Sequence, residues 1–232
     1  MFKTFLIKLN DINYKDSLLI QEHLQNRLIQ ESFDIQYLLF VNYNQHIYTQ
    51  GKYGNKSNLL IDKKIREKLN ITLFETDRGG DITYHGPGQL VVYPIFNLKK
   101  MNYGVKKYVS DIEKVIKNLL YDMAVQPNTD ENRTGVWVGG GKIASLGINI
   151  KKHITKHGFS ININNDLSYF KYINTCGFKN MKVTSLKNEL GKDINLDICY
   201  ERLVLDMISI FNLDLIKSDA VEIADIPMKR AL

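Results

Sequence analysis

The chain has 232 residues, of which 44% are hydrophobic and 24% are charged, and its formal net charge is +6. This length suits one domain with a sizeable core, and the composition is that of an ordinary globular protein. No apolar run approaches the ~20 residues that a membrane-spanning helix needs. The N-terminus turns polar after residues 5–7, unlike a secretory signal or a transit peptide, so we expect a cytosolic protein.

The positive charge is spread over single lysines and pairs rather than gathered in a basic tract. That pattern is typical of a solvated basic surface, and it leaves room for an acidic protein partner. Nucleic acid is the alternative partner that the net charge raises.

The first half of the chain predicts a strand at the N-terminus, one helix and four further strands. These are placed by the 3.6-residue and two-residue apolar periods over residues 14–31, 36–43, 46–51, 71–77 and 89–98. The helix carries Ile20, Leu24 and Leu28 on one stripe. Asn44 and Gln45 separate the second and third of these strands, and this break predicts a hairpin between them.

The second half predicts two long helices around a run of three strands. The helices cover residues 104–124 and 196–211, and the strands cover 134–140, 142–150 and 158–164. The residues from Leu213 onward have a weak pattern, and we expect them to lie loosely on the surface. The sequence therefore predicts one α/β (α+β) domain over residues 1–212, with a mixed sheet flanked by helices, and a tail over residues 213–232.

The segment "RGGDITYHGPGQL", residues 78–90, holds four glycines within thirteen residues. It lacks the lysine of a phosphate-binding Walker loop, and a strand follows it where a Rossmann fingerprint requires a helix. Two interpretations remain open from the residues alone. The glycines form a tight turn, or they let the backbone approach a ligand beside Arg78, Thr83, Tyr84 and His85.

Two histidines and one cysteine elsewhere in the chain are further candidates for a functional site. His153 and His157 are four residues apart in a stretch between two predicted strands, where that spacing means ~13 Å. We therefore predict no metal site there. Cys199 lies in a helical pattern beside Ile198 and Tyr200, and we interpret it as a small buried hydrophobe.

Cys176 differs because "INTCGF" is a short polar break with glycine directly after the cysteine. A nucleophilic thiol needs a neighbouring base or cation. His85, His157 and Lys142 are the candidates, and distance along the sequence does not choose among them.

Four blocks in this order resemble the lipoyl(octanoyl) transferases: "RGGDITYHGPGQLVVYPI", "TGVWVGGGKIASLGINI", "HGFSININNDL" and "INTCGF". The resemblance covers roughly residues 35–190. It implies a fold similar to the biotin and lipoate protein ligases, and an acyltransferase that needs no cofactor. Such an enzyme moves an octanoyl or lipoyl group from acyl carrier protein to a lysine of a lipoyl domain, in 2-oxoacid dehydrogenases or the glycine cleavage H protein, during lipoate biosynthesis.

The resemblance also implies roles for particular residues. Cys176 matches the family's nucleophile and Lys142 its acid/base lysine. The family's acyl-pocket segments fall on Arg78, Gly79, Gly80, Asp81, Ile82, Thr83, Tyr84, His85, Ser145, Leu146, Gly147, Gly158, Phe159 and Ser160. The glycine segment would then wall an octanoyl pocket, with Arg78, Thr83 and His85 at its polar rim. Thr175 replaces the family's usual proline, and residues 139–141 are richer in glycine than in many members.

A mechanism follows from this resemblance and from ordinary acidities. Burial disfavours charge, whereas mutual attraction favours a Cys176 thiolate beside a Lys142 ammonium. The thiolate attacks the carrier's thioester, and Lys142 afterwards loses its anionic partner. As a neutral amine it takes a proton from the acceptor lysine. ATP has no role, because the acyl group arrives already activated.

Two rival functions make different demands on the chain. An ATP-dependent lipoate or biotin ligase of the same fold needs a nucleotide-binding loop, of the G-R-G-R type in the biotin case, and has no use for Cys176. A basic nucleic-acid-binding module predicts salt-sensitive binding and gives no reason for the glycine segment.

Overall fold

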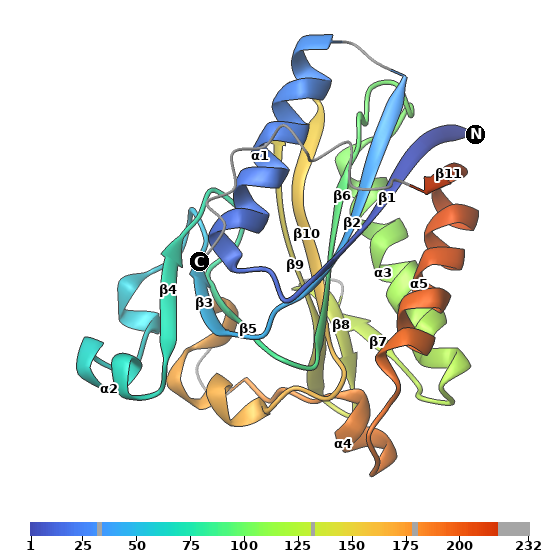
Figure 1. Cartoon of the computed structure of the whole chain (residues 1–232). Helices are drawn as coiled ribbons and strands as arrows, with labels where there is room; N and C mark the ends of the chain where they lie inside the picture. The colour runs from blue at the N-terminus through green and yellow to red at the C-terminus, as the bar shows by residue number, and fades with distance from the viewer. Residues whose placement is uncertain (32–33, 131–132, 178–180, 218–232) are drawn as a thin grey trace.

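The computed structural model describes residues 1–31, 34–130, 133–177 and 181–217 (Figure 1). Within them, eight strands form the main sheet, and the mixed-sheet α/β fold is confirmed. The order across this sheet is β11 (Leu213–Lys217), β1 (Phe2–Asn10), β2 (Ile35–Asn42), β6 (Gln89–Ile95), β10 (Ile154–Asn162), β9 (Gly141–Lys151), β8 (Arg133–Val138) and β7 (Asn128–Asp130). The first three strands are parallel to one another, and every later pairing is antiparallel.

Helices cover both faces of this sheet, with α1 (Tyr14–Glu31) on one face and α3 (Val105–Asp122) and α5 (Leu196–Phe211) on the other (Figure 1). Alternation along the strands supplies both cores. On β6, Leu90 and Val92 pack toward α3 and α5, whereas Val91 and Tyr93 pack toward α1. The three long helices predicted from the sequence are confirmed. Among the described residues, no helix has the length and apolar content to cross a bilayer.

A second, smaller sheet lies beside the α1 face of the main sheet. Its order is β4 (Ile71–Glu75), β3 (His46–Gln50) and β5 (Ile82–His85). The short helices η1 (Lys56–Asn58), α2 (Lys63–Lys68), η2 (Leu167–Tyr172), η3 (Thr175–Gly177) and α4 (Leu186–Leu190) complete the described chain. Tyr48, Tyr84 and Phe170 join this sheet to η2 in a separate small core.

This second sheet overturns the expectation of a hairpin, and one of its strands divides the glycine segment. The predicted hairpin is wrong, because β2 pairs with β1 and β6, whereas β3 pairs with β4 and β5. β2 is buried on both faces, so the break at Asn44 and Gln45 carries the chain from one sheet to the other rather than back alongside β2. The glycine segment is not one continuous loop, because β5 lies within it.

The expectation of a loose tail is wrong for its first residues. β11 (Leu213–Lys217) pairs in parallel with β1, with Phe2 opposite Leu213. Leu213 is fully buried, so it contributes apolar burial that the weak pattern of the segment does not reveal. Residues 218–232 lie outside the described residues, and the division into a catalytic domain over 1–212 and a tail over 213–232 stays a prediction.

Candidate active site

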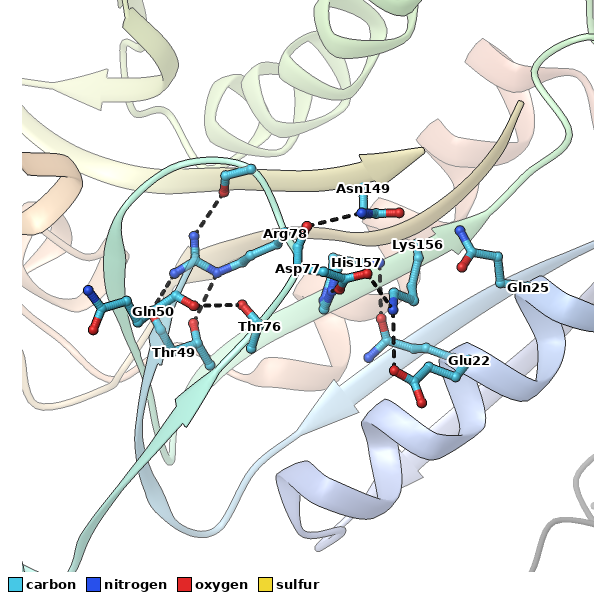
Figure 2. Close-up of polar contacts among 12 residues, drawn as sticks. Glu22, Gln25, Thr49, Gln50, Thr76, Asp77, Arg78, Asn149, Lys156 and His157 are labelled. Atoms are coloured by element: carbon cyan, nitrogen blue, oxygen red, sulfur yellow. Dashed lines mark hydrogen bonds and ion pairs between the residues drawn. The ribbon is translucent and has the colours of Figure 1, made fainter. Parts of the chain in front are cut away.

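Arg78 acts as a clasp for the turn between β4 and β5. Its guanidinium donates to Thr49 Oγ1 at 3.1 Å and to Thr49 O at 2.5 Å (Figure 2). It also donates to Asp81 O at 2.6 Å and to Gly79 O at 3.0 Å. Because its planar fork matches several acceptors at once, one side chain orders the whole turn. Gly79 N also donates to Ile148 O at 3.0 Å, which fastens the turn to β9.

A cavity opens between the second sheet and the α1 face of the main sheet. Its empty space, the open mouth included, is about 470 Å³. The residues that line it come from α1, from the turn after β4, and from strands β5, β6, β9 and β10.

All but two of the predicted pocket residues line this cavity, and the exceptions are Gly79 and Tyr84. Tyr84 faces the other side of the second sheet, where its hydroxyl lies 2.9 Å from His46 Nδ1 and its ring stacks on Tyr169. Arg78, Thr83 and His85 were expected at the rim. They are instead 6–7% exposed and belong to the wall. Arg78 is drawn inward because its acceptors are two oxygens of Thr49 on β3 and two backbone oxygens of the turn.

The cavity also includes four residues that the sequence interpretation missed: Tyr14, Val91, Tyr93 and His157. Val91 and Tyr93 could have been found from alternation along β6, since they share the face that points toward α1. Tyr14 and His157 come from the first turn of a helix and from an irregular point of a strand, and neither position marks a pocket in the sequence.

Two glycines let the walls approach one another closely. A Cβ on Gly147 would lie 2.9 Å from Arg78 Cδ, and a Cβ on Gly158 would lie 2.1 Å from Val92 O. Any side chain at these places would push the turn or β6 away from the neighbouring strand. The two glycines therefore explain how the cavity stays narrow.

The polar groups of the wall form a connected path. His85 Nδ1 lies 2.8 Å from Gln89 Oε1, Gln89 Nε2 donates to Asn162 Oδ1 at 2.9 Å, and Asn162 Nδ2 donates to Thr184 O at 3.0 Å. Burial lowers the pKa of His85 to about 4, so the ring is neutral at pH 7. Thr83 Oγ1 is buried and has no hydrogen-bond partner within the described part of the chain. It is the wall atom best suited to bond a polar group of a ligand.

Lys142 stands near the start of β9, three residues before the cavity residue Ser145. It is 4% exposed, and its Nζ donates to Thr134 O at 3.0 Å and lies 5.0 Å from the centre of the Trp137 ring. Its backbone bonds to Lys182 O and Thr184 N fix the strand. The amine is thus held in a defined, nearly dry position.

Cys176 lies in η3 (Thr175–Gly177), and its side chain is outside the described residues. η3 packs against β5, which forms one wall of the cavity. Asn58 joins the two, since its Nδ2 donates to Asp81 Oδ2 at 2.5 Å and its Oδ1 accepts from Asn174 Nδ2 at 3.2 Å. The turn with Cys176 therefore adjoins the mouth of the cavity at Asp81.

The remaining candidates have other partners. His157 Nε2 lies 2.8 Å from Asp77 Oδ1, and the neighbouring Lys156 Nζ contacts both Asp77 and Glu22 (Figure 2). Cys199 is fully buried on α5, and burial raises the pKa of its thiol to about 11. The expectation that Cys199 is a small buried hydrophobe is confirmed. Across the described ranges, no group of three or more His, Cys, Asp or Glu side chains is arranged to hold a metal ion.

Comparisons with known proteins agree with this architecture. Residues 13–207 match the family described as the lipoyl protein ligase A/B catalytic domain. An octanoyltransferase of Caldicellulosiruptor bescii is 40% identical over 191 residues, which are 82% of this chain and 83% of that protein.

Solved structures share the fold at low identity. A bipartite lipoate protein ligase from Thermoplasma acidophilum superposes with a TM-score of 0.70 at 17% identity, over 94% of this chain and 87% of that one. A biotin protein ligase from Aquifex aeolicus gives 0.54 at 12% identity, over 91% and 71%. The extent of the family match and the identity to the curated relative lead to one conclusion: this chain belongs to the lipoyl protein ligase A/B catalytic domain family.

Proposed function

We propose that this protein is an octanoyltransferase that forms a thioester between an octanoyl group and Cys176 and passes the group to a lysine of a lipoyl domain. The observation that carries the proposal is the position of the η3 turn. It packs against β5, one wall of a largely buried cavity, while β9 of the opposite wall carries Lys142. The octanoyltransferase of C. bescii, 40% identical over most of both chains, supports the same reaction.

In the first half-reaction, the Cys176 thiolate attacks the carbonyl carbon of an octanoyl thioester on acyl carrier protein. The C–S bond to the carrier breaks, and the leaving carrier thiolate takes the proton of the Lys142 ammonium, which leaves Lys142 as a neutral amine. The cavity-lining groups of residues 78–85, Gly79 and Tyr84 excepted, with those of 145–147 and 158–160, enclose the acyl chain. Neutral His85 and the unpartnered Thr83 Oγ1 supply polar contacts without adding a charge to the cavity.

In the second half-reaction, the acceptor lysine attacks the Cys176 thioester. Lys142, as a neutral amine, takes the proton that the attacking nitrogen loses, and the Cys176 thiolate is released as the amide forms. The close contacts of Lys142 with Thr134 O and the Trp137 ring hold the amine in place for this transfer. The acyl group enters as a thioester, so no nucleotide is needed to activate it.

The acidic carrier would dock on exposed lysines of η1 and of α2, the helix that follows η1 and packs against β4. η1 adjoins the mouth through Asn58, and Lys56, Lys63, Lys64 and Lys68 on η1 and α2 are exposed. Reversing two of these charges, Lys63→Glu with Lys64→Glu, should raise the KM for octanoyl-acyl carrier protein and leave the reaction with octanoyl-pantetheine unchanged. An equal loss with both donors would refute this docking site.

The covalent step is tested by intact-protein mass spectrometry after mixing with octanoyl-acyl carrier protein and no acceptor. The wild type should gain one hydroxylamine-labile octanoyl group, and Cys176→Ser should gain none. Cys199→Ala is the matched control and should behave as the wild type, because Cys199 is buried in the core. An adduct on Cys199, or transfer to a lipoyl domain that proceeds in Cys176→Ser, would overturn the proposal.

A further inference from the structure

The cavity is closed at one end by side chains from three different elements. Tyr14 begins α1, Tyr93 lies on β6 and His157 lies on β10, and they are 1%, 3% and 2% exposed. Asp81 and Ser145, by contrast, are partly exposed. The three side chains thus belong to the buried part of the lining, whereas Asp81, next to the η3 turn, belongs to the partly exposed part.

Positions along the strands place the closed end far from Lys142. Ser160 of β10 pairs with Ser145 of β9, the strand on which Lys142 stands three residues earlier. His157 lies three residues further along β10, which at the usual rise per residue is roughly 10 Å. Lys142 lies a further three residues, roughly another 10 Å, before Ser145, so a chain that enters at the η3 turn would fill only the far half of this path, from Ser160 to His157.

His157 has an unusual backbone for a residue inside a strand. Its φ is 60°, in the left-handed region that side chains other than glycine seldom occupy. Such strain persists only where surrounding contacts hold it. Here Asp77 holds the ring at 2.8 Å, and Asp77 is itself held by Lys156 Nζ at 2.9 Å (Figure 2).

The two tyrosines are also fixed by their neighbours. The Tyr93 hydroxyl lies 3.0 Å from that of Tyr43, which lies 2.6 Å from Ser17 Oγ. The Tyr14 ring packs against Phe74 with its centroid 4.8 Å away. All three side chains of the closed end are thus braced from behind, so they resist displacement by a ligand.

We propose that Tyr14, Tyr93 and His157 form an end wall that selects acyl chain length, admitting an octanoyl group and excluding longer saturated chains. This inference rests on the proposed function. A longer chain has to displace a braced ring or leave methylenes outside the pocket. Differences of one methylene in an apolar site are worth roughly 10- to 200-fold in rate constants.

The test is the single-turnover rate of Cys176 acylation with octanoyl-, decanoyl- and dodecanoyl-pantetheine. His157→Gly removes the ring and suits the left-handed backbone, since glycine adopts positive φ without strain. We expect its decanoyl-to-octanoyl rate ratio to rise at least about tenfold over that of the wild type. Tyr14→Leu shortens the wall from another element and should shift the ratio in the same direction, so it decides the matter if His157→Gly does not fold.

His153→Gly is the matched control. His153 is exposed, has a φ of 66° and lies in the turn between β9 and β10, away from the cavity. The same change of residue should leave the chain-length profile as in the wild type. The end wall is refuted if folded wall variants keep the octanoyl preference, or if His153→Gly shifts it equally. If no thioester of any length acylates the wild type, the proposed function fails as well, and that result is distinct from the previous one.

Discussion

The main sheet is packed on both faces by apolar side chains, whereas the turn between β4 and β5 that walls the cavity is held largely by polar contacts. α3 and α5 bury one face of the main sheet and α1 buries the other. The turn and strand that wall the cavity depend instead on the Arg78 clasp and on the Asp81–Asn58–Asn174 bonds. The stability of the fold and the position of the cavity wall therefore have separate causes. Apolar burial stabilises the main sheet, and directional hydrogen bonds hold the turn between β4 and β5 in place.

Lys142 stands on the scaffold, and the proposed mechanism assigns it the proton transfer, so changing it should have the largest effect. Lys142→Ala should lower octanoyl transfer about 100- to 10,000-fold, the usual range for loss of a general acid or base. Lys142→Arg keeps the charge, yet a guanidinium does not give up its proton. It should therefore retain part of the self-acylation and still fail to pass the octanoyl group on.

These two half-reactions are read by single-turnover acylation and by transfer to a lipoyl domain. If Lys142→Arg transfers at the wild-type rate, Lys142 is not the proton acceptor, and His85 and His157 become the residues to test.

A break in the clasp should separate activity from stability. Arg78→Lys keeps a charge but loses the planar fork, so the turn should shift by the order of 1 Å and activity should fall about 100-fold. The matched core change is Ile116→Ala on α3, a fully buried residue. It should lower the free energy of unfolding by about 2–5 kcal/mol and leave the kcat of the folded fraction near that of the wild type.

Urea unfolding and kcat, measured on both variants, test this contrast. Equal losses of activity and stability in the two variants would show that the Arg78 turn and the apolar core do not differ in this way.

The link at the mouth should have a smaller effect. Asn58→Ala removes both bonds between the Asp81 turn and Asn174, and a loss of about tenfold in acylation rate is expected from hydrogen bonds of ordinary strength. Asn55→Ala is the control on the same short helix, because Asn55 caps η1 and its side chain accepts a hydrogen bond from Ser57 N. A matching loss in the control would assign the effect to η1 as a whole rather than to the link.

The buried histidine in the wall should show in the pH dependence of stability. Because the pKa of His85 is lowered from about 6.5 to about 4, the unfolded chain takes up a proton in this interval and the folded protein does not. The contribution of His85 to the free energy of unfolding is therefore fully present above about pH 6.5. It declines toward pH 4, by at most about 3 kcal/mol.

His85→Gln removes the titrating ring and should flatten that decline, as measured by urea unfolding at several pH values. His157, whose pKa burial also lowers, contributes in the same direction and leaves a residual slope. A slope that is unchanged in His85→Gln would contradict the assignment.

The sequence predicts the scaffold better than it predicts the pairing of its parts. The helices α1, α3 and α5 follow from apolar periodicity, because each buries one face against the sheet. The partners of β2 and β3 are distant in the chain, so a break at Asn44 and Gln45 reads as a hairpin although it joins two sheets. β11 was missed because a short edge strand needs little apolar pattern of its own.

The candidate site divides in the same way. The glycine segment and the blocks around Ser145 and Gly158 are recognisable by composition and by resemblance, and they meet at one cavity. The closed end is not recognisable, since the role of His157 depends on a left-handed backbone and on Asp77, which lies 80 residues away. The roles of Cys176 and Lys142 stay predictions.

The central claim is that an octanoyl group on Cys176 lies between the two sheets. The most direct measurement is a crystal structure of the protein after reaction with octanoyl-pantetheine in the absence of acceptor. It should show continuous density from Cys176 Sγ, past Thr83 and Ser160, to the wall of Tyr14, Tyr93 and His157. Density for the acyl chain outside this cavity, or an octanoyl group attached to any other residue, would contradict the account.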